Sequence, residues 1–511
     1  MLIPFDLIAA MLFLGFYIAK PDPAPPAAAY SAAVIAAFAA AFALAGGGLD
    51  FLALRHVRTG GRTLAERRLA AASAENLLRV LLVAGYACAL ELSSFPWAMA
   101  ERLGLYAGGG SFWIQLLALA PYALYFVCVW LPMYGLHRET FPGKWTRRSF
   151  LVHKARYNLV LLVAWIPFAA FSEWVTDALI ALPFLVFAAA WTFPYLLVKL
   201  WGCKPIADPE LLALVDGLEK RAGARFSRVY MWEPGGGRMQ NAAAVGILPP
   251  FRYLFLTPAL VAGLRRDELE AVVLHELGHI KKRHLLFYLV TTLAGINVAA
   301  IIGGFLPLDG ELERFAITVA LLLFYFRFVF GWLSRNMERQ ADLFSLATTG
   351  SAVSLVNALE KLGISAGNVR NARSWHHLGI AERVRFLRLA ERDPKPYLMH
   401  EEGCRRIAVA GYAFSIAALA FIGYALFETS LHVAHAAPAR HREIAHWRRV
   451  TQLLPGSAVG RLELAYRLAS DPATREEAKR LAAEALRLSS ASEERKAAEK
   501  LLDELDREGR W

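Results

Sequence analysis

The stretch Ala271–His284, AVVLHELGHIKKRH, sets two histidines and a glutamate close together as His275-Glu276-Leu277-Gly278-His279. On a helix, residues four positions apart lie one turn apart on the same face, so His275 and His279 could offer nitrogens to one ion. Zinc takes such nitrogens at about 2.0–2.1 Å, and a catalytic zinc site keeps one position for water. Glu276 stands beside a ligand, where it would take a proton from that water.

A five-residue pattern with two free positions also occurs by chance, so its surroundings matter. Asp267 and Glu270 precede it in a spacing like that of a capping box, which predicts a helix over about 268–283. Leu274, Leu277 and Gly278 are apolar or small, as a buried site helix requires. Burying two histidines and a glutamate on such a helix costs free energy unless something binds them, which favours a metal site over a chance match.

A zinc protease site needs a third protein ligand, and the stretch Ser334–Asp342, SRNMERQAD, supplies a candidate. We predict Glu338 as that ligand. Asp342 follows four residues later on the same helical face, where it could accept a hydrogen bond from a ligand histidine and fix its tautomer. A solvated helix face is the alternative for this short pattern, but its order after H-E-x-x-H favours the metal site.

The two motifs HELGH and ERQAD together resemble the integral-membrane zinc metallopeptidases that include CAAX prenyl protease type 1 and the HtpX heat-shock protease. Gln240-Asn241-Ala242-Ala243 is similar to the Asn-Ala segment that precedes the catalytic helix in that family. The resemblance covers roughly 205–392. It implies one Zn²⁺ per chain, peptidase activity, and substrate binding by Asn241 and Ala242, although Asn241 also fits an ordinary turn-flanking residue.

A later segment, Trp375-His376-His377 with Ala381-Glu382-Arg383-Val384, also resembles the family. The resemblance implies that His377 donates a hydrogen bond to the oxyanion during catalysis, with His376 as the alternative. In the family a proline usually follows the histidine, whereas here none follows either one, so both alternatives stay open. Arg383 is expected to pair with an acidic neighbour.

The composition places the chain in a membrane. Of its 511 residues 57% are hydrophobic, and they occur in long runs. The net charge of +12 lies in clusters between these runs, as membrane topology requires, so no nucleic-acid partner is expected. The four cysteines form no C-x-x-C pattern and imply neither a disulfide framework nor a cysteine-ligated zinc.

Nine apolar segments approach the length of about 20 residues that crosses a bilayer. They lie near 2–18, 29–49, 77–95, 112–133, 157–172, 177–199, 285–307, 315–333 and 405–427. The first lacks the positive start of a cleaved signal peptide, so we expect a retained helix, with a signal anchor as the alternative. Arg327 inside the eighth segment would face a polar chamber or reach toward the membrane interface.

The basic residues give an orientation. Arginines and lysines crowd the loops at 55–68 and 138–156, whereas the alternate loops are acidic, so the basic loops belong in the cytoplasm. The alternation then puts 200–284 and 334–404 inside and the tail outside. A hairpin of the seventh and eighth spans returns Glu338 to the side that holds His279. Asp309, in an L-D-G like that of site-2 proteases, lies a whole span away, on the order of 30 Å, which disfavours that class.

Between the sixth span and the H-E-x-x-H stretch lies a small mixed segment. An amphipathic helix is expected over 208–222, a strand at 229–232, and a hairpin of 239–245 with 253–256 around Pro249-Pro250. An edge strand beside a zinc site could bind an extended substrate by strand addition. After the ninth span the chain becomes charged and helical, and its helices resemble tetratricopeptide-type hairpins without a convincing repeat.

These observations predict a mainly α fold: a polytopic helical membrane protein with a small α+β zincin-like catalytic domain and a C-terminal soluble helical, TPR-like tail. The predicted boundaries are 1–200 for the N-terminal membrane domain, 201–404 for the peptidase domain with its inserted hairpin 285–333, 405–427 for the last span and 428–511 for the tail.

The predicted function is that of a membrane zinc endopeptidase in a bacterial inner membrane, acting at the cytoplasmic face on peptides or membrane proteins. CAAX-type processing and membrane quality control both fit. The tail would bind a protein partner, and the bilayer would surround the spans. The alternatives are a non-catalytic scaffold with a relic or structural metal site, and a transporter with an intramembrane metal site. The scaffold is disfavoured because it has no need of Glu276. The transporter is disfavoured because it would hold its ligands at mid-membrane, whereas these ligands map to the interface.

Overall fold

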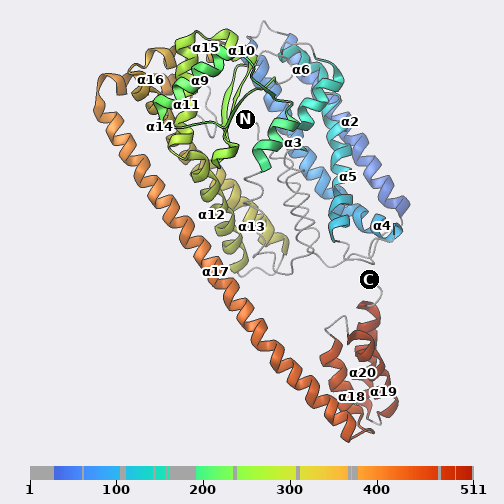
Figure 1. Ribbon diagram of the computed structural model, residues 1–511. Helices are drawn as coiled ribbons and strands as arrows, with labels where there is room; N and C mark the ends of the chain where they lie inside the picture. The colour runs from blue at the N-terminus through green and yellow to red at the C-terminus, as the bar shows by residue number, and fades with distance from the viewer. Residues whose placement is uncertain are drawn as a thin grey trace. The chain divides into compact units, whose positions relative to one another are not determined.

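The computed structural model divides the chain into two compact units, Met1–Ala418 and Leu419–Trp511 (Figure 1). The structure describes residues 28–59, 63–103, 111–141, 145–156, 158–159, 192–233, 239–306, 311–365, 370, 378–469, 474–489 and 491–508. Several sequence predictions therefore lie outside the described residues: the span near 2–18, most of those near 157–172 and 177–199, Asp309, His376 and His377.

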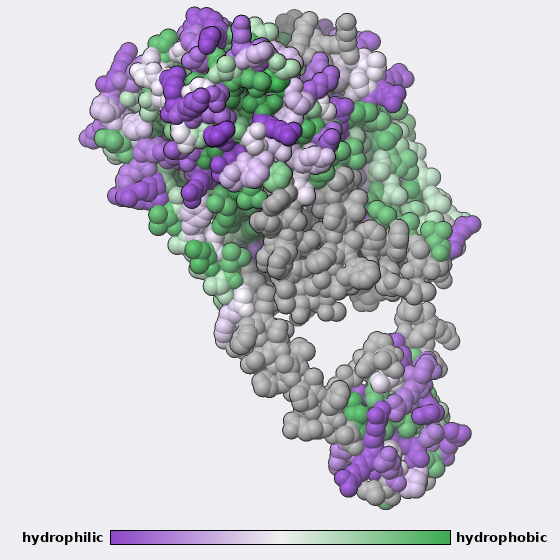
Figure 2. Space-filling model, in the orientation of Figure 1, coloured by the Kyte–Doolittle hydropathy of each residue, from purple (hydrophilic) through white to green (hydrophobic). Residues whose placement is uncertain are grey.

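The N-terminal helices pack around an aromatic and leucine-rich core. They are α2 (Ala28–Arg58), α3 (Leu64–Ser93), α4 (Phe95–Arg102), α5 (Ser111–Trp130) and α6 (Tyr134–Thr140). Tyr86, Tyr125 and Trp130 are almost fully buried among them. The outward face of the same helices is apolar (Figure 2), as a surface that meets lipid must be.

Apolar helices long enough to cross a membrane confirm a multi-pass architecture. Within the described residues five pass that test, or six if the bent pair α5–α6 counts as one span. They are Ala29–Arg58, Glu66–Ser93, His284–Gly303, Ala316–Thr349 and Pro394–Phe421. The last begins earlier than the predicted 405–427, because the apolar run continues a helix whose first turns are polar.

A four-stranded sheet lies in the part of the chain that carries H-E-x-x-H. Its strands are β1 (Lys204–Pro205), β2 (Arg228–Met231), β3 (Ala242–Val245) and β4 (Tyr253–Leu256), in the order β1-β2-β4-β3. The predicted hairpin is confirmed, since β3 pairs antiparallel with β4 around a 3₁₀ turn, η2 (Pro249–Phe251). β4 is buried along its length and β3 forms an edge of the sheet, so an extended chain could pair along the outer side of β3.

Helices cover the sheet and share one core with it. They are α9 (Pro209–Ala222), α10 (Pro258–Gly263), α11 (Arg266–Lys281), α15 (Val353–Ser365) and α16 (Ile380–Arg392). α9 begins where predicted, because the Asp208 side chain accepts hydrogen bonds from the backbone N–H groups of Glu210 and Leu211.

The helix that carries H-E-x-x-H begins differently from the prediction. Asp267 and Glu270 do not form its cap; instead the Glu268 side chain accepts the N–H of Arg265 at 2.8 Å. Glu268 is buried and its carboxylate also receives the Lys361 ammonium at 2.6 Å, so this tertiary ion pair selects Glu268 over Asp267 and Glu270.

A membrane hairpin connects the two halves of the predicted site. Arg283, with a left-handed φ of 57°, separates α11 from α12 (His284–Phe305), and the chain returns through α13 (Glu311–Phe324), a π-helical turn η3 (Tyr325–Phe330) and α14 (Gly331–Thr349). The Tyr325 hydroxyl donates to the backbone oxygen of Thr291 at 2.6 Å and ties the two arms together. Arg327 is exposed and its guanidinium lies over the Phe328 ring, and both alternatives for it stay predictions.

The C-terminal unit is helical, as predicted. The long helix α17 (Pro394–Leu453) leads into α18 (Ala458–Ala469), α19 (Arg475–Leu488) and α20 (Ser492–Glu508). Leu464, Leu468, Ala482 and Leu501 are buried between these helices and form a core of their own. The resemblance to tetratricopeptide hairpins stays a prediction.

Candidate metal centre

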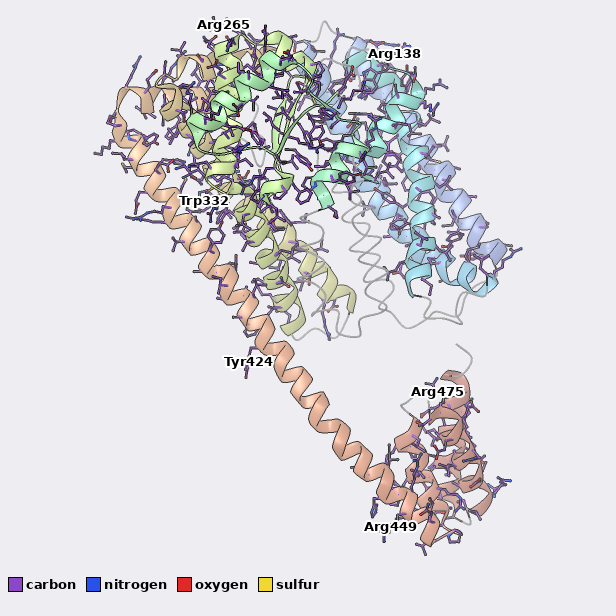
Figure 3. All side chains as sticks on the ribbon, viewed as in Figure 1. Arg138, Arg265, Trp332, Tyr424, Arg449 and Arg475 are labelled. Carbon is purple, nitrogen blue, oxygen red and sulfur yellow. The ribbon has the colours of Figure 1, made fainter. Side chains whose placement is uncertain are left out.

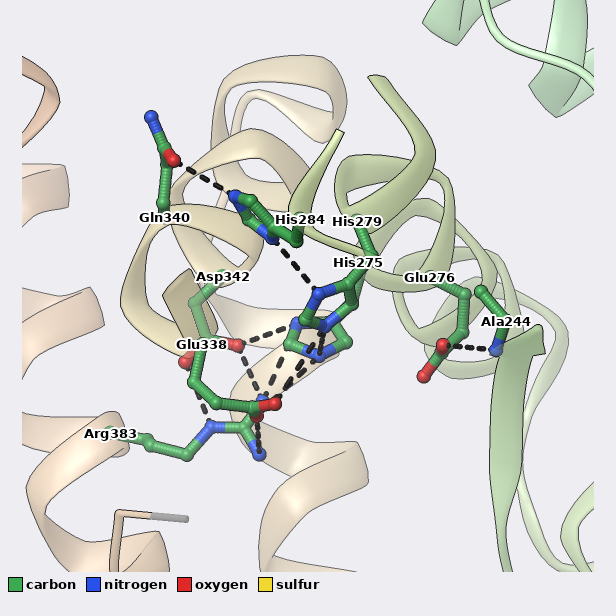
Figure 4. A network of polar contacts seen from close by, with 9 residues as sticks. All are labelled: Ala244, His275, Glu276, His279, His284, Glu338, Gln340, Asp342 and Arg383. Carbon is green, nitrogen blue, oxygen red and sulfur yellow. Dashed lines mark hydrogen bonds and ion pairs between the residues drawn. The ribbon is translucent and has the colours of Figure 1, made fainter. Parts of the chain in front are cut away.

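The close crossing of α11 and α14 creates the site. A Cβ atom built on Gly278 would lie 3.2 Å from the Ala341 Cα and 3.2 Å from the Phe344 Cβ. The absent side chain therefore lets the two helix backbones approach each other. Glu338 and Asp342 on α14 are consequently brought against His275 and His279 on α11 (Figure 4).

Three side chains converge on one point. The Nε2 atoms of His275 and His279 are 3.2 Å apart, and the Glu338 carboxylate oxygens lie 3.8 Å and 3.7 Å from them. Two nitrogens bound tetrahedrally at about 2.05 Å would stand about 3.3 Å apart. All three residues are buried, and their ligand atoms lie within 4.8 Å of one another, so the donor set fits a zinc ion.

His275 is oriented by a buried carboxylate. Its Nδ1 lies 2.9 Å from the Asp342 Oδ1, and because a carboxylate only accepts, Nδ1 carries the proton and Nε2 the lone pair. Arg383 on α16 donates to both oxygens of Asp342, from Nε at 2.8 Å and from Nη2 at 2.5 Å. The acidic neighbour expected for Arg383 is thus Asp342, and the arginine neutralises a carboxylate that is fully buried.

The pKa values of His275 and His279 are shifted in opposite directions. Burial lowers the pKa of His275, but its hydrogen bond to Asp342 and the negative charge of that carboxylate outweigh burial and raise the pKa overall. Burial and the neighbouring His275 hold the pKa of His279 well below its usual range, so its ring stays neutral. A neutral imidazole with a free lone pair is the form that binds a metal.

Glu276 points away from Glu338, toward the edge strand (Figure 4). Its Oε2 accepts the backbone N–H of Ala244 on β3 at 2.7 Å. Burial raises the pKa of its carboxyl, against the lowering effects of His275 and of this hydrogen bond. A partly exposed carboxylate whose pKa is raised, and which keeps lone pairs on Oε1, suits a general base.

The predicted substrate residues lie at the start of β3. The Asn241 backbone exchanges hydrogen bonds with Thr257, and Ala242 pairs with Leu256. Asn241 immediately precedes β3 and Ala242 begins it, two residues before Ala244, whose N–H binds Glu276. Their role in binding substrate stays a prediction, as does that of His377.

Two polar residues near the ligands were not predicted. His284, the first residue of α12, lies with its Nδ1 2.9 Å from the Nδ1 of His279, and its Nε2 lies 2.9 Å from Gln340 on α14. The available signal was weak: a histidine five residues after His279, and a glutamine between Glu338 and Asp342.

The helix crossing gives a stability prediction. Gly278→Val should destabilise the protein by about 1–3 kcal/mol through overpacking and should weaken zinc binding, because α14 must shift away from α11. Gly217→Val, in α9, is the matched control, since a Cβ there meets nothing within 4 Å. Thermal unfolding and zinc titration of both variants would check this, and equal behaviour of the two would contradict the crossing.

Residues 207–426 match Peptidase family M48. A "Protease HtpX homolog" from Acidiphilium cryptum is 31% identical over 236 residues, which cover 42% of this chain and 80% of that protein. Another from Thermococcus sibiricus is 30% identical and covers 36% of this chain and 68% of that protein. The crystal structure of S. mikatae Ste24p superposes with a TM-score of 0.50 at 19% identity, covering 72% of this chain and all of that one.

Proposed function

Because the chain belongs to Peptidase family M48 and is a membrane metallopeptidase of the HtpX and Ste24 type, we propose that it hydrolyses peptide bonds at the cytoplasmic face of its membrane. The convergence of His275, His279 and Glu338, with Glu276 one residue from a ligand, carries this proposal. A non-catalytic scaffold would need neither this complete set of donors nor a base.

The proposed mechanism assigns each side chain a task. His275, His279 and Glu338 would hold the ion, which would supply Lewis-acid chemistry at the scissile carbonyl and at a water molecule. Glu276 takes the proton of that water at Oε1 and later gives it to the leaving amine. The N–H of Ala244 holds Oε2 at 2.7 Å, which keeps the carboxylate aimed during both transfers.

The substrate is proposed to bind as an added strand along β3. The strand is an edge of the sheet, and it touches Glu276 through Ala244. Backbone pairing of this kind accepts many sequences, which suits a peptidase acting on membrane proteins or on lipid-modified chain ends. Asn241 and Ala242 would hold the substrate backbone where this strand begins.

The cytoplasmic location rests on the basic loops. Arg68, in the first basic cluster and in the first turns of α3, donates from Nη1 to the backbone oxygen of Ser365 at 3.2 Å. Arg138, in the second basic cluster and on α6, lies at the same end of the unit as Arg265 (Figure 3). Because arginine-rich loops stay in the cytoplasm, the site would face it too, in a bacterial inner membrane, with the tail outside and free to bind a protein partner.

Metal removal tests the proposal. The full chain, purified in detergent, should contain about one zinc ion per molecule and cleave casein. Phenanthroline should abolish cleavage, and added zinc should restore it, whereas a serine-protease inhibitor should change nothing. Cleavage that survives complete removal of zinc would contradict the proposed chemistry. Labelling of introduced cysteines at Arg138 and Arg265 in intact cells and in inverted vesicles would test the orientation separately.

A further inference from the structure

The second metal-facing histidine is supported by a chain of side chains rather than by a carboxylate beside it. The Nδ1 of His279 lies 2.9 Å from the Nδ1 of His284, on the side of the ring away from Glu338 (Figure 4). The Nε2 of His284 lies 2.9 Å from the Oε1 of Gln340. By contrast, the Nδ1 of His275 meets Asp342 directly.

The chain of contacts continues from α14 to α17. The Nε2 of Gln340 donates to the Oε2 of Glu401 at 3.0 Å, and the Lys282 ammonium donates to the same oxygen at 2.8 Å. Glu401 thus ends the chain as a carboxylate held by a neighbouring cation. Three elements of the fold, α12, α14 and α17, each contribute one member to it.

The chemistry of each group dictates the direction of every hydrogen bond. The Glu401 carboxylate only accepts, so the Gln340 amide nitrogen faces it and the Gln340 oxygen faces His284. That oxygen also only accepts, so His284 carries its proton on Nε2 and leaves a lone pair on Nδ1. His279 must then donate from Nδ1, which leaves the lone pair of its Nε2 toward His275 and Glu338.

Burial makes this arrangement specific. His284 is 1% exposed and Gln340 7% exposed, so water cannot easily replace either partner. The left-handed turn at Arg283 folds the start of α12 back so that His284 reaches His279. His284 and Gln340 are each paired on both sides, so losing one of them leaves its neighbour unpaired.

We propose that His284, Gln340 and Glu401 form a positioning relay that holds the ring of His279 in its metal-binding tautomer and orientation. The inference rests on the proposed function, in which His279 is a zinc ligand. The relay residues touch neither the ion nor the substrate. They act through His279, and they tie its orientation to α17, the helix that enters the last candidate span.

Gln340→Met and Glu401→Leu break the relay at two separate points with side chains of similar size. Glu401→Gln is the conservative variant, because its amide oxygen still accepts from Gln340 and Lys282. Glu402→Gln is the matched control, since Glu402 binds Arg405 and Arg406 on the surface one residue away. All are made in the full chain and purified in detergent.

Zinc affinity is measured by competition with a chromophoric chelator, and ligand geometry by the visible spectrum of the Co²⁺-loaded protein. Gln340→Met and Glu401→Leu should weaken zinc binding by about 10–100-fold and alter the Co²⁺ spectrum. Glu401→Gln and Glu402→Gln should match the wild type in both. Casein cleavage by the first two should fall more at limiting zinc than at saturating zinc.

The outcomes separate the relay from the function it serves. Wild-type affinity and an unchanged Co²⁺ spectrum in Gln340→Met would overturn the relay and leave the peptidase proposal intact. An equal loss in Glu402→Gln would make the effect general to α17 and overturn it as well. A wild-type protein that neither holds zinc nor cleaves casein would overturn both proposals.

Discussion

Glu276→Gln is expected to lower kcat/KM for casein by at least about 10²–10⁴-fold while the protein keeps its zinc. The amide has nearly the same shape, and its oxygen can still accept the Ala244 N–H that holds the carboxylate at 2.7 Å. The fold and the metal ligands should therefore be unchanged. The amide cannot take a proton from water, so only the chemical step is lost.

Measurement of bound zinc and of casein cleavage in the same preparations checks this. Glu270→Gln is a matched control on the same helix, because Glu270 pairs with Arg266 at the surface and lies outside the site. Retained cleavage in Glu276→Gln would show that another group is the base. If both proteins hold zinc and neither cleaves casein, the result would favour a peptidase with a narrow choice of substrate, or a non-catalytic scaffold.

Glu338→Gln is expected to lose bound zinc, in contrast to Glu276→Gln, which should keep it. A neutral amide oxygen is a weaker ligand for zinc than a carboxylate, and the change also removes the negative charge beside Arg383, 3.8 Å away. Zinc affinity should fall by more than the roughly 10–100-fold that loss of an outer partner costs. Cleavage should fall with it and recover in part at high zinc.

The comparison of the two variants separates the roles of the two glutamates. Both changes replace a carboxylate by an amide of equal size near the same pair of histidines, so size does not distinguish them. Elemental analysis should find zinc in Glu276→Gln and little in Glu338→Gln at equal free metal. The reverse pattern would exchange the two roles and would refute the ligand assignment.

The local spacing of residues was enough to find the candidate ligands. His275 and His279, and likewise Glu338 and Asp342, are four residues apart, and the α-helix has a fixed period, so each pair must share a face wherever the helix lies. The long apolar runs also predicted membrane helices from local sequence alone, because bilayer thickness sets the length of a span. The hairpin of β3 with β4 also followed from short-range pattern and turn residues.

Contacts between distant segments determined the rest. The pairing of Asp342 with His275 rather than His279 depends on how α11 crosses α14 at Gly278, and the cap of α11 depends on Lys361. Gln340 and Glu401 lie 56 and 117 positions from His284, and no periodic pattern relates such residues. Local periodicity therefore identified which side chains could bind zinc, whereas the packing of α12, α14 and α17 determined which partners hold those side chains in place.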